Sequence, residues 1–100
     1  MNDKLLGFLG LCRKAGKLTF GFDAVVRKAK EEGSGLVLVT KDFSPRSLRS
    51  AKEKLNNFGA QVIILDDISM DDLCSILKRK TGIVLIEGVN FKNGIRRLLD

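Results

Sequence analysis

The residues that could do chemistry in this chain are mainly cations, and several of them surround a glycine in KLTFGFDAVVRK (residues 17–28). Gly21 stands between a short apolar segment that predicts a strand and a longer one that predicts a helix. The N-terminus of a helix carries free N–H groups and partial positive charge, and glycine lets a ligand come close to that backbone. The stretch therefore predicts either an anion-binding helix N-terminus or an ordinary turn.

Several groups that enzymes commonly use are absent from the sequence. The chain has no His, Tyr or Trp, so it lacks the commonest general base, the commonest metal ligand and the strongest stacking side chains. The carboxylate pairs Asp66–Asp67 and Asp71–Asp72 fall at a strand exit and in a helix first turn, where a structural role is favoured. No glycine-rich phosphate loop of the GxxxxGK[ST] or GxGxxG type occurs. We expect no catalytic residue, no bound metal and no cofactor.

The elements that must position these residues include five predicted helices. Apolar residues at helical spacing predict helices over residues 2–15, with Asn2 as a cap, and over residues 22–32, ended by Gly33. Three further helices are predicted from their first residues, which are Ser44 with Pro45, Ser69 with Asp72 in a capping box, and Asn90.

Short apolar runs between these helices predict the strands. Leu18 and Phe20 indicate a very short strand, and GLVLVT (35–40), QVIIL (61–65) and IVLI (83–86) each predict a buried strand. Strands that alternate with helices predict an α/β fold, a three-layer α/β/α sandwich around a small and mostly parallel sheet. The length suits a single domain over residues 1–100.

Two features concern where the protein works. No apolar run approaches the roughly 20 residues that span a bilayer, and the cations after the first apolar stretch argue against a signal peptide. Cys12 and Cys74 each lie within an apolar helical pattern, which predicts two buried thiols in a reducing compartment. We therefore expect a cytoplasmic protein without a membrane partner.

Positive charge is unevenly distributed along the chain. The formal net charge is +6; residues 1–60 hold 12 basic and 6 acidic side chains, whereas residues 61–100 hold 6 of each. Many cations fall near predicted strand ends and helix starts, where α/β proteins bind ligands. They are Lys17, Arg27, Lys28, Lys41, Arg46, Arg49, Arg79 and Lys80. The pattern favours a polyanion-binding face, and a generally charged surface is the simpler alternative.

The order of elements and several local sequences resemble one known family. The segments are LGLCRKAGKLTFGFDAVVRKAK near the start, LVLVTKDFSP in the middle and KTGIVLIEGVNF near the end. Together they resemble the ribosomal L-seven-Ae / L-thirty-e family, which binds kink-turn RNA, and look closest to its small bacterial ribosomal-protein-like members. The resemblance covers nearly the whole chain and implies a four-stranded mixed sheet with one antiparallel strand.

The resemblance also implies an RNA-binding site. RNA-binding members open their second helix with a Gly-x-Asn-Glu-x-x-Lys pattern, which matches residues 21–27. Gly21 and the cation Arg27 are kept, whereas Asp23 and Ala24 replace the family's Asn and Glu. Because Asp23 accepts but cannot donate and Ala24 does neither, recognition of the kink's G·A pairs is expected to weaken. The full predicted RNA-binding set is Lys17, Gly21, Phe22, Asp23, Arg27, Lys28, Lys41, Asp42, Arg46, Arg49, Lys80, Thr81 and Gly82.

Three functions remain open from the sequence. The first is a non-catalytic, monomeric RNA-binding protein that is ribosome-associated or binds structured RNA, with ribosomal proteins as further partners. The second is a protein-interaction module that kept the fold and lost specific RNA recognition, which the Asp23–Ala24 pair favours. The third is an RNA-modifying enzyme, for which 100 residues leave no room for a catalytic domain. We expect the first, without enzymatic activity.

Overall fold

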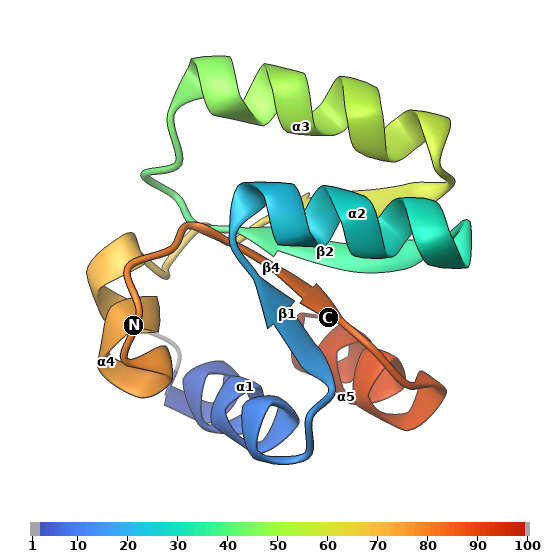
Figure 1. Cartoon of the computed structure of the whole chain (residues 1–100). Coiled ribbons are helices and arrows are strands. Elements are labelled where there is room, and N and C mark those ends of the chain that lie inside the picture. The colour runs from blue at the N-terminus through green and yellow to red at the C-terminus, as the bar shows by residue number, and fades with distance from the viewer. Residues whose placement is uncertain (1–2, 100) are drawn as a thin grey trace.

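Residues 3–99, which the computed structural model describes, form five helices and four strands (Figure 1). In chain order they are α1 (Asp3–Lys14), β1 (Leu18–Phe20), α2 (Phe22–Glu32), β2 (Gly35–Val39), α3 (Pro45–Asn57), β3 (Ala60–Ile64), α4 (Met70–Leu77), β4 (Ile83–Ile86) and α5 (Val89–Leu99). The predicted elements are therefore confirmed, with small shifts at their ends. The predicted cap Asn2 lies outside the described residues.

The four strands form one mixed sheet in the order β1-β4-β2-β3. β2 and β3 are parallel, whereas β4 runs antiparallel to both of its neighbours, β1 and β2. The mostly parallel sheet expected from the alternation of elements is therefore wrong, and the mixed sheet with one antiparallel strand is confirmed. Alternation along the chain cannot reveal this, because β4 enters between two strands that are distant in sequence.

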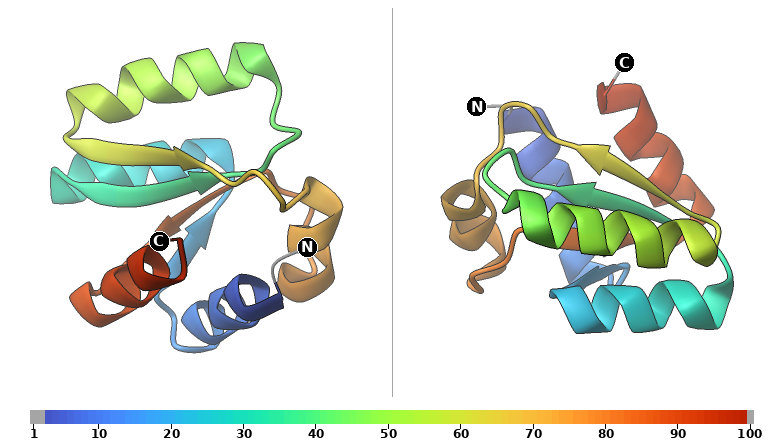
Figure 2. Two further views of the ribbon diagram at one scale, coloured as in Figure 1. Left: turned by 180° about the vertical axis from the view of Figure 1, so that it is seen from behind. Right: turned by 90° about the horizontal axis from the view of Figure 1, so that it is seen from above.

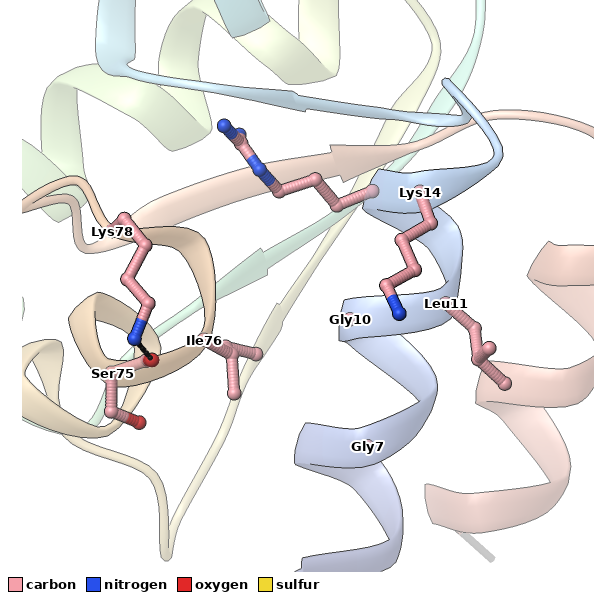
Figure 3. Close-up of a pocket in the computed structure, with 8 residues that line it drawn as sticks. Gly7, Gly10, Leu11, Lys14, Ser75, Ile76 and Lys78 are labelled. Carbon is pink, nitrogen blue, oxygen red and sulfur yellow. Dashed lines mark hydrogen bonds between the residues drawn. The ribbon is translucent and has the colours of Figure 1, made fainter.

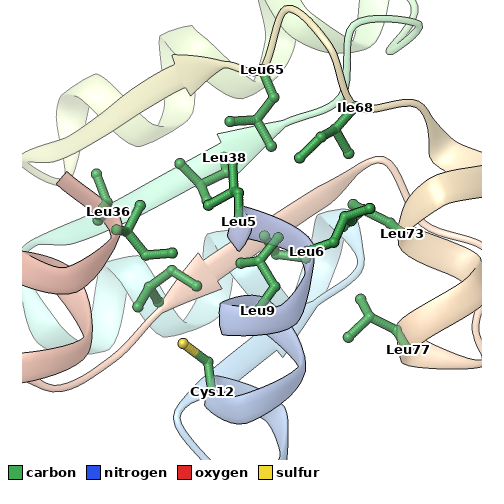
Figure 4. Packing of buried hydrophobic residues seen from close by; sticks show 13 residues of the cluster. Leu5, Leu6, Leu9, Cys12, Leu36, Leu38, Leu65, Ile68, Leu73 and Leu77 are labelled. Atoms are coloured by element: carbon green, nitrogen blue, oxygen red, sulfur yellow. The ribbon is translucent and has the colours of Figure 1, made fainter. Parts of the chain in front are cut away.

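Helices cover both faces of the sheet, as predicted for a three-layer α/β/α sandwich. Helices α2 and α3 lie on one face, and α1, α4 and α5 lie on the other (Figures 1 and 2). Each face has its own apolar cluster. Figure 4 shows the one beneath α1 and α4, where Leu5 and Leu9 pack with Leu36 and Leu38 of β2. The opposite cluster joins Val25 of α2 to the other side of the same strands.

The two inner strands, β2 and β4, are buried along their lengths, apart from half-buried Gly35, and these predictions are confirmed. The prediction that residues 61–65 form a buried strand is wrong. β3 is an edge strand with half-buried Val62 and Ile63, and Ile64 is 42% exposed. Its apolar composition could not show this, because burial depends on the place of a strand in the sheet.

Local capping explains where two of the helices begin. The Ser44 hydroxyl accepts a hydrogen bond from the Ser47 N–H at 3.1 Å, before Pro45 opens α3. Ser69 and Asp72 form the predicted capping box of α4, with both hydrogen bonds present. Helix α5 begins one residue earlier than predicted.

The apolar side chains along α4 and α5 differ in burial. Leu73, Leu77 and Ile95 are fully buried. The remaining four are half-buried, namely Met70, Ile76, Phe91 and Leu98.

The two thiols differ in their surroundings, and both are free. Cys12 is fully buried between α1 and the sheet, and this burial raises the pKa of its thiol to about 11. Cys74 is only half-buried, so the prediction of two buried thiols holds for Cys12 alone.

No helix within residues 3–99 is both long and apolar enough to cross a membrane.

Candidate nucleic-acid interface

Three loops that are far apart in the sequence meet at one end of the sheet, on the same side of the molecule (Figure 1). The Gly21 N–H donates to the Ile83 carbonyl at 3.2 Å, and the Thr40 N–H donates to the Gly82 carbonyl at 2.9 Å. These bonds join the start of α2, the segment after β2 and the segment before β4. We call the surface formed by residues 20–23, 40–46 and 80–83 the Gly21 surface.

Gly21 has a backbone conformation that glycine adopts far more readily than other residues. Its φ is 94° and its ψ is 141°, and a Cβ atom placed there would meet no heavy atom within 4 Å. Among the described residues no side chain caps the start of α2, in contrast to the serine caps of α3 and α4. The first N–H groups of α2 therefore have no capping side chain among these residues, and the space on the Cβ side of Gly21 is open.

Five of the predicted cations are exposed on the Gly21 surface or in the first two turns of α2 and α3, the helices that begin there. They are Arg27, Lys41, Arg46, Arg49 and Lys80. Within residues 3–99, none of the five forms an ion pair with a carboxylate. Asp23 is also exposed, on the same outer side of α2 as Arg27. This part of the molecule therefore presents unpaired positive charge beside the uncapped start of α2.

Two predicted site residues, Lys17 and Lys28, lie away from this surface. Lys17 precedes β1 at its opposite end, where its carbonyl accepts the Glu87 N–H at 2.8 Å. The ammonium group of Lys28 lies 3.4 Å from the Glu87 carboxylate and 3.5 Å from that of Glu32. Its hydrogen bond with Glu87 is the main reason why the pKa of Lys28 is raised. Sequence proximity to Gly21 was misleading for Lys17, because the start and the end of β1 lie at opposite ends of the sheet's strands.

Asp42 has a structural partner at the predicted site. Its carboxylate accepts the Met70 N–H at 2.9 Å, which ties the loop after β2 to the start of α4. The nearby Thr40 hydroxyl is the main cause that lowers the pKa of Asp42, and the Met70 N–H acts in the same direction. The Thr40 hydroxyl itself is buried and makes no hydrogen bond of standard geometry among the described residues.

Thr81 and Gly82 shape the loop before β4. The buried Thr81 hydroxyl donates to the Ile83 carbonyl at 3.0 Å and accepts the Ile83 N–H at 3.3 Å. A Cβ atom on Gly82 would lie 2.7 Å from the Phe43 ring, so only glycine fits there without a shift. Their neighbour Lys80 is exposed, so its side chain is the one that this loop offers to a ligand.

Aromatic rings near the surface are covered by cations. The Arg13 guanidinium lies 5.0 Å from the centre of the Phe20 ring, and the Lys54 ammonium group lies 5.3 Å from that of Phe22. Phe22 is half-buried against the α2–α3 side of the core, so its ring is not free to stack on a base. Sequence reasoning did not place Arg13 at this surface, because spacing along the chain does not reveal which strand α1 contacts.

The described residues contain no group of three or more His, Cys, Asp or Glu side chains that could hold a metal ion. Asp72 has the structural role that its position predicts, because its carboxylate accepts the Ser69 N–H at 3.0 Å. What the surface offers chemically is hydrogen-bond donors and positive charge, which suits a polyanion.

Comparisons with known proteins identify the fold alone. No protein-family model matches the chain, and no curated protein matches it. Among solved structures it is similar to a Bacillus halodurans protein described as having unknown function, with a TM-score of 0.85 and 19% identity. That similarity covers 97% of each chain, so the two proteins share one complete fold.

Proposed function

We propose that this protein is a non-catalytic, cytoplasmic RNA-binding protein that acts on the ribosome or on another structured RNA. The observation that carries the proposal is the uncapped start of α2 with five exposed cations, unpaired within residues 3–99, that lie on the Gly21 surface or in the first two turns of α2 and α3. Both features favour the binding of phosphate groups, because helix N–H groups and cations each stabilise negative charge. The resemblance to the ribosomal L-seven-Ae / L-thirty-e family points to the same surface.

The side chains at the start of α2 favour phosphate contact over base reading. Asp23 is exposed and can only accept hydrogen bonds, and Ala24 offers no polar group. Two missing base-edge groups, at about 1–3 kcal/mol each, would lower kink-turn selectivity by orders of magnitude. Contacts with the backbone need neither group, so binding to structured RNA persists with little sequence preference.

The same Asp23–Ala24 pair supports a second candidate function, a protein-interaction module. A carboxylate at a phosphate-binding helix start opposes RNA, whereas it can pair with a basic partner protein. Salt dependence of binding to defined RNA separates the two candidates, because a module that has lost RNA recognition has no RNA affinity to titrate.

The proposal predicts a strong salt dependence for binding to labelled structured RNA. If Arg27, Lys41, Arg46, Arg49 and Lys80 each meet a phosphate, the logarithm of affinity should fall against the logarithm of salt concentration with a slope of about −4 to −5. Replacement of one of them, as in Lys80→Ala, should make the slope less steep by about one. Fluorescence anisotropy over a range of salt concentrations measures both quantities.

Lys28→Ala is the matched control for this experiment. Lys28 carries the same charge, but its ammonium group is paired with Glu32 and Glu87 at the far end of β4. Its removal should therefore leave the slope unchanged. A wild-type slope near zero, or an equal effect of Lys28→Ala and Lys80→Ala, would contradict RNA binding through the Gly21 surface.

A further inference from the structure

A groove between α1 and α4 lies outside the predicted site (Figure 3). Its cavity volume is ≈ 570 Å³, and the side chain of Ile76 on α4 points toward α1 across it. The lining residues are Gly7, Gly10, Leu11, Arg13, Lys14, Ser75, Ile76 and Lys78. None of the helices α1 to α5 fills this space, so it is accessible to a ligand.

The rim of the groove is cationic. Arg13 and Lys14 stand at the end of α1, and Lys78 stands opposite at the end of α4. None of the residues that line the groove is acidic, and within residues 3–99 none of the three cations is paired with a carboxylate. Lys78 donates one hydrogen bond to the Ser75 carbonyl at 2.9 Å and has further donors available. The charge of the groove therefore complements an anionic ligand.

The floor of the groove is apolar and open. Gly7 and Gly10 present bare helix backbone, with no heavy atom within 4 Å of a Cβ placed at either position. Half-buried Ile76 and Leu11, which is 56% exposed, supply apolar contact. A cationic rim suits the phosphates of a single nucleic-acid strand, and the open apolar floor leaves room for an unpaired base.

The groove is continuous with the Gly21 surface at two points. The Arg13 guanidinium on its rim lies over the Phe20 ring, one residue before Gly21. On the other side, Lys78 is followed by exposed Arg79 and Lys80, which lead to the start of β4. A strand that leaves a structured RNA bound at the Gly21 surface can therefore enter the groove past Arg13 on one side or along Arg79 and Lys80 on the other.

We propose that the α1–α4 groove binds a single-stranded RNA segment adjoining the structured RNA. This inference rests on the proposed function, because continuity with the Gly21 surface is what favours RNA over an acidic peptide. Lys14 and Arg13 contact the phosphates of the segment, and a base lies on the bare backbone at Gly10.

A tail on the RNA tests the proposal. Two labelled kink-turn duplexes each carry an oligouridine tail of about six nucleotides, one at one end and one at the other. The same duplex without a tail is the reference. A tail on one end should increase the affinity of the wild type about tenfold, because its phosphates gain contacts with Arg13 and Lys14. Lys14→Ala should lower this gain, and Gly10→Gln should abolish it by filling the floor.

Gly10→Gln is suited to this test because it leaves the fold and the Gly21 surface intact. Glutamine is a better helix former than glycine, and the Cβ position is open, so the variant should be at least as stable as the wild type. Its affinity for the duplex without a tail should be unchanged. A loss of that affinity would mean that the groove is part of the duplex site, which would overturn the proposal.

A spectroscopic reporter locates the tail directly. The chain has no tryptophan, so Leu11→Trp introduces a single fluorophore at an exposed position of the groove. Its emission should change with the tailed duplex and not with the plain one. Equal affinity for the tailed and the plain duplex would overturn the groove proposal and leave the proposed function standing. If neither duplex binds, the groove proposal and the proposed function are both overturned. Binding of an oligoglutamate peptide with no effect of the tail would assign the groove to an acidic protein segment instead.

Discussion

Lys28 and Lys80 carry the same ammonium group, yet the fold gives them different availability. Lys28 lies between two carboxylates, whereas Lys80 is exposed and unpaired among residues 3–99. The positive charge of the molecule is therefore available to a ligand at some cations and internally compensated at others. Sequence position showed the cations but not their partners, because Glu87 reaches Lys28 only after β4 has paired with β1.

Cys12 allows a prediction about pH and stability at the level of one residue. Burial raises the pKa of its thiol from 9.0 to about 11, so the folded protein retains a proton that the unfolded chain loses between these values. Its contribution is fully present below pH 9 and is lost as pH rises through 11, a difference of about 3 kcal/mol. Cys12→Ala lacks this contribution, so its stability deficit at pH 8 should shrink at pH 10.5 in urea denaturation.

Cys74 provides the comparison for that experiment. It is half-buried on α4, so a mild alkylating reagent should modify it in the native protein well before Cys12. In Cys74→Ala only the buried Cys12 thiol remains, so the same reagent should react slowly with this variant. If Cys12 were modified as fast as Cys74, or if the deficit of Cys12→Ala were constant with pH, the assignment of Cys12 as a buried thiol would be wrong.

At the scale of elements, the junction between β1 and α2 depends on the backbone of Gly21. Its φ of 94° is unfavourable for a residue with a Cβ, although the space around it is open. Gly21→Ala should therefore lower the free energy of unfolding by about 1–3 kcal/mol through strain alone. Gly21→Val should in addition lower the affinity for RNA, because its β-branched side chain would stand in front of the first N–H groups of α2.

Gly7→Ala is the control for the junction. Gly7 lies inside α1 with equally open space but does not need a positive φ, so alanine should raise the stability by about 0.5–1 kcal/mol. If urea denaturation shows that Gly21→Ala lowers the free energy of unfolding and Gly7→Ala raises it, the backbone conformation and not a steric clash decides the effect at Gly21. An unchanged stability of Gly21→Ala would remove the argument that the junction requires glycine.

The elements were predictable from the sequence to different degrees for a physical reason. Caps and helical periodicity are local, so α3 and α4 begin where Ser44 and Ser69 predict. The edge position of β3 and the antiparallel direction of β4 are set by pairing between distant segments, which no local pattern encodes. The same limit applies to the site. Gly21, Lys41 and Lys80 were predicted together, whereas the far position of Lys17 depends on strand direction.

At the scale of the whole molecule, the surface combines parts of both helical layers. Helices α2 and α3 supply Arg27, Arg46 and Arg49 from one face of the sheet, and Lys80 follows α4 on the other. Each layer is fixed to the sheet by its own buried cluster. Because the two clusters share β2 and β4, the spacing between these cations is set by the core. This pre-formed spacing favours a structured ligand over a flexible one.

The last prediction asks whether this assembled surface keeps the geometry for kink-turn RNA. Asp23→Asn combined with Ala24→Glu introduces the pair found in RNA-binding members of the family that the sequence resembles, and it leaves the net charge unchanged because one carboxylate replaces another. The salt slope should therefore stay the same. The ratio of affinities for a kink-turn over a plain duplex should rise about tenfold or more, since asparagine donates as well as accepts and glutamate accepts from guanine N–H groups.

The single changes Asp23→Asn and Ala24→Glu are the controls, since each alters the charge by one and supplies only one reading group. Each should change affinity for both RNAs alike through charge and give only part of the gain in selectivity. If the double variant folds as the wild type does and gains no selectivity, the start of α2 is an ordinary turn with respect to base reading. If Gly21→Val also leaves the RNA affinity unchanged, an acidic protein partner would better explain the cations of this surface.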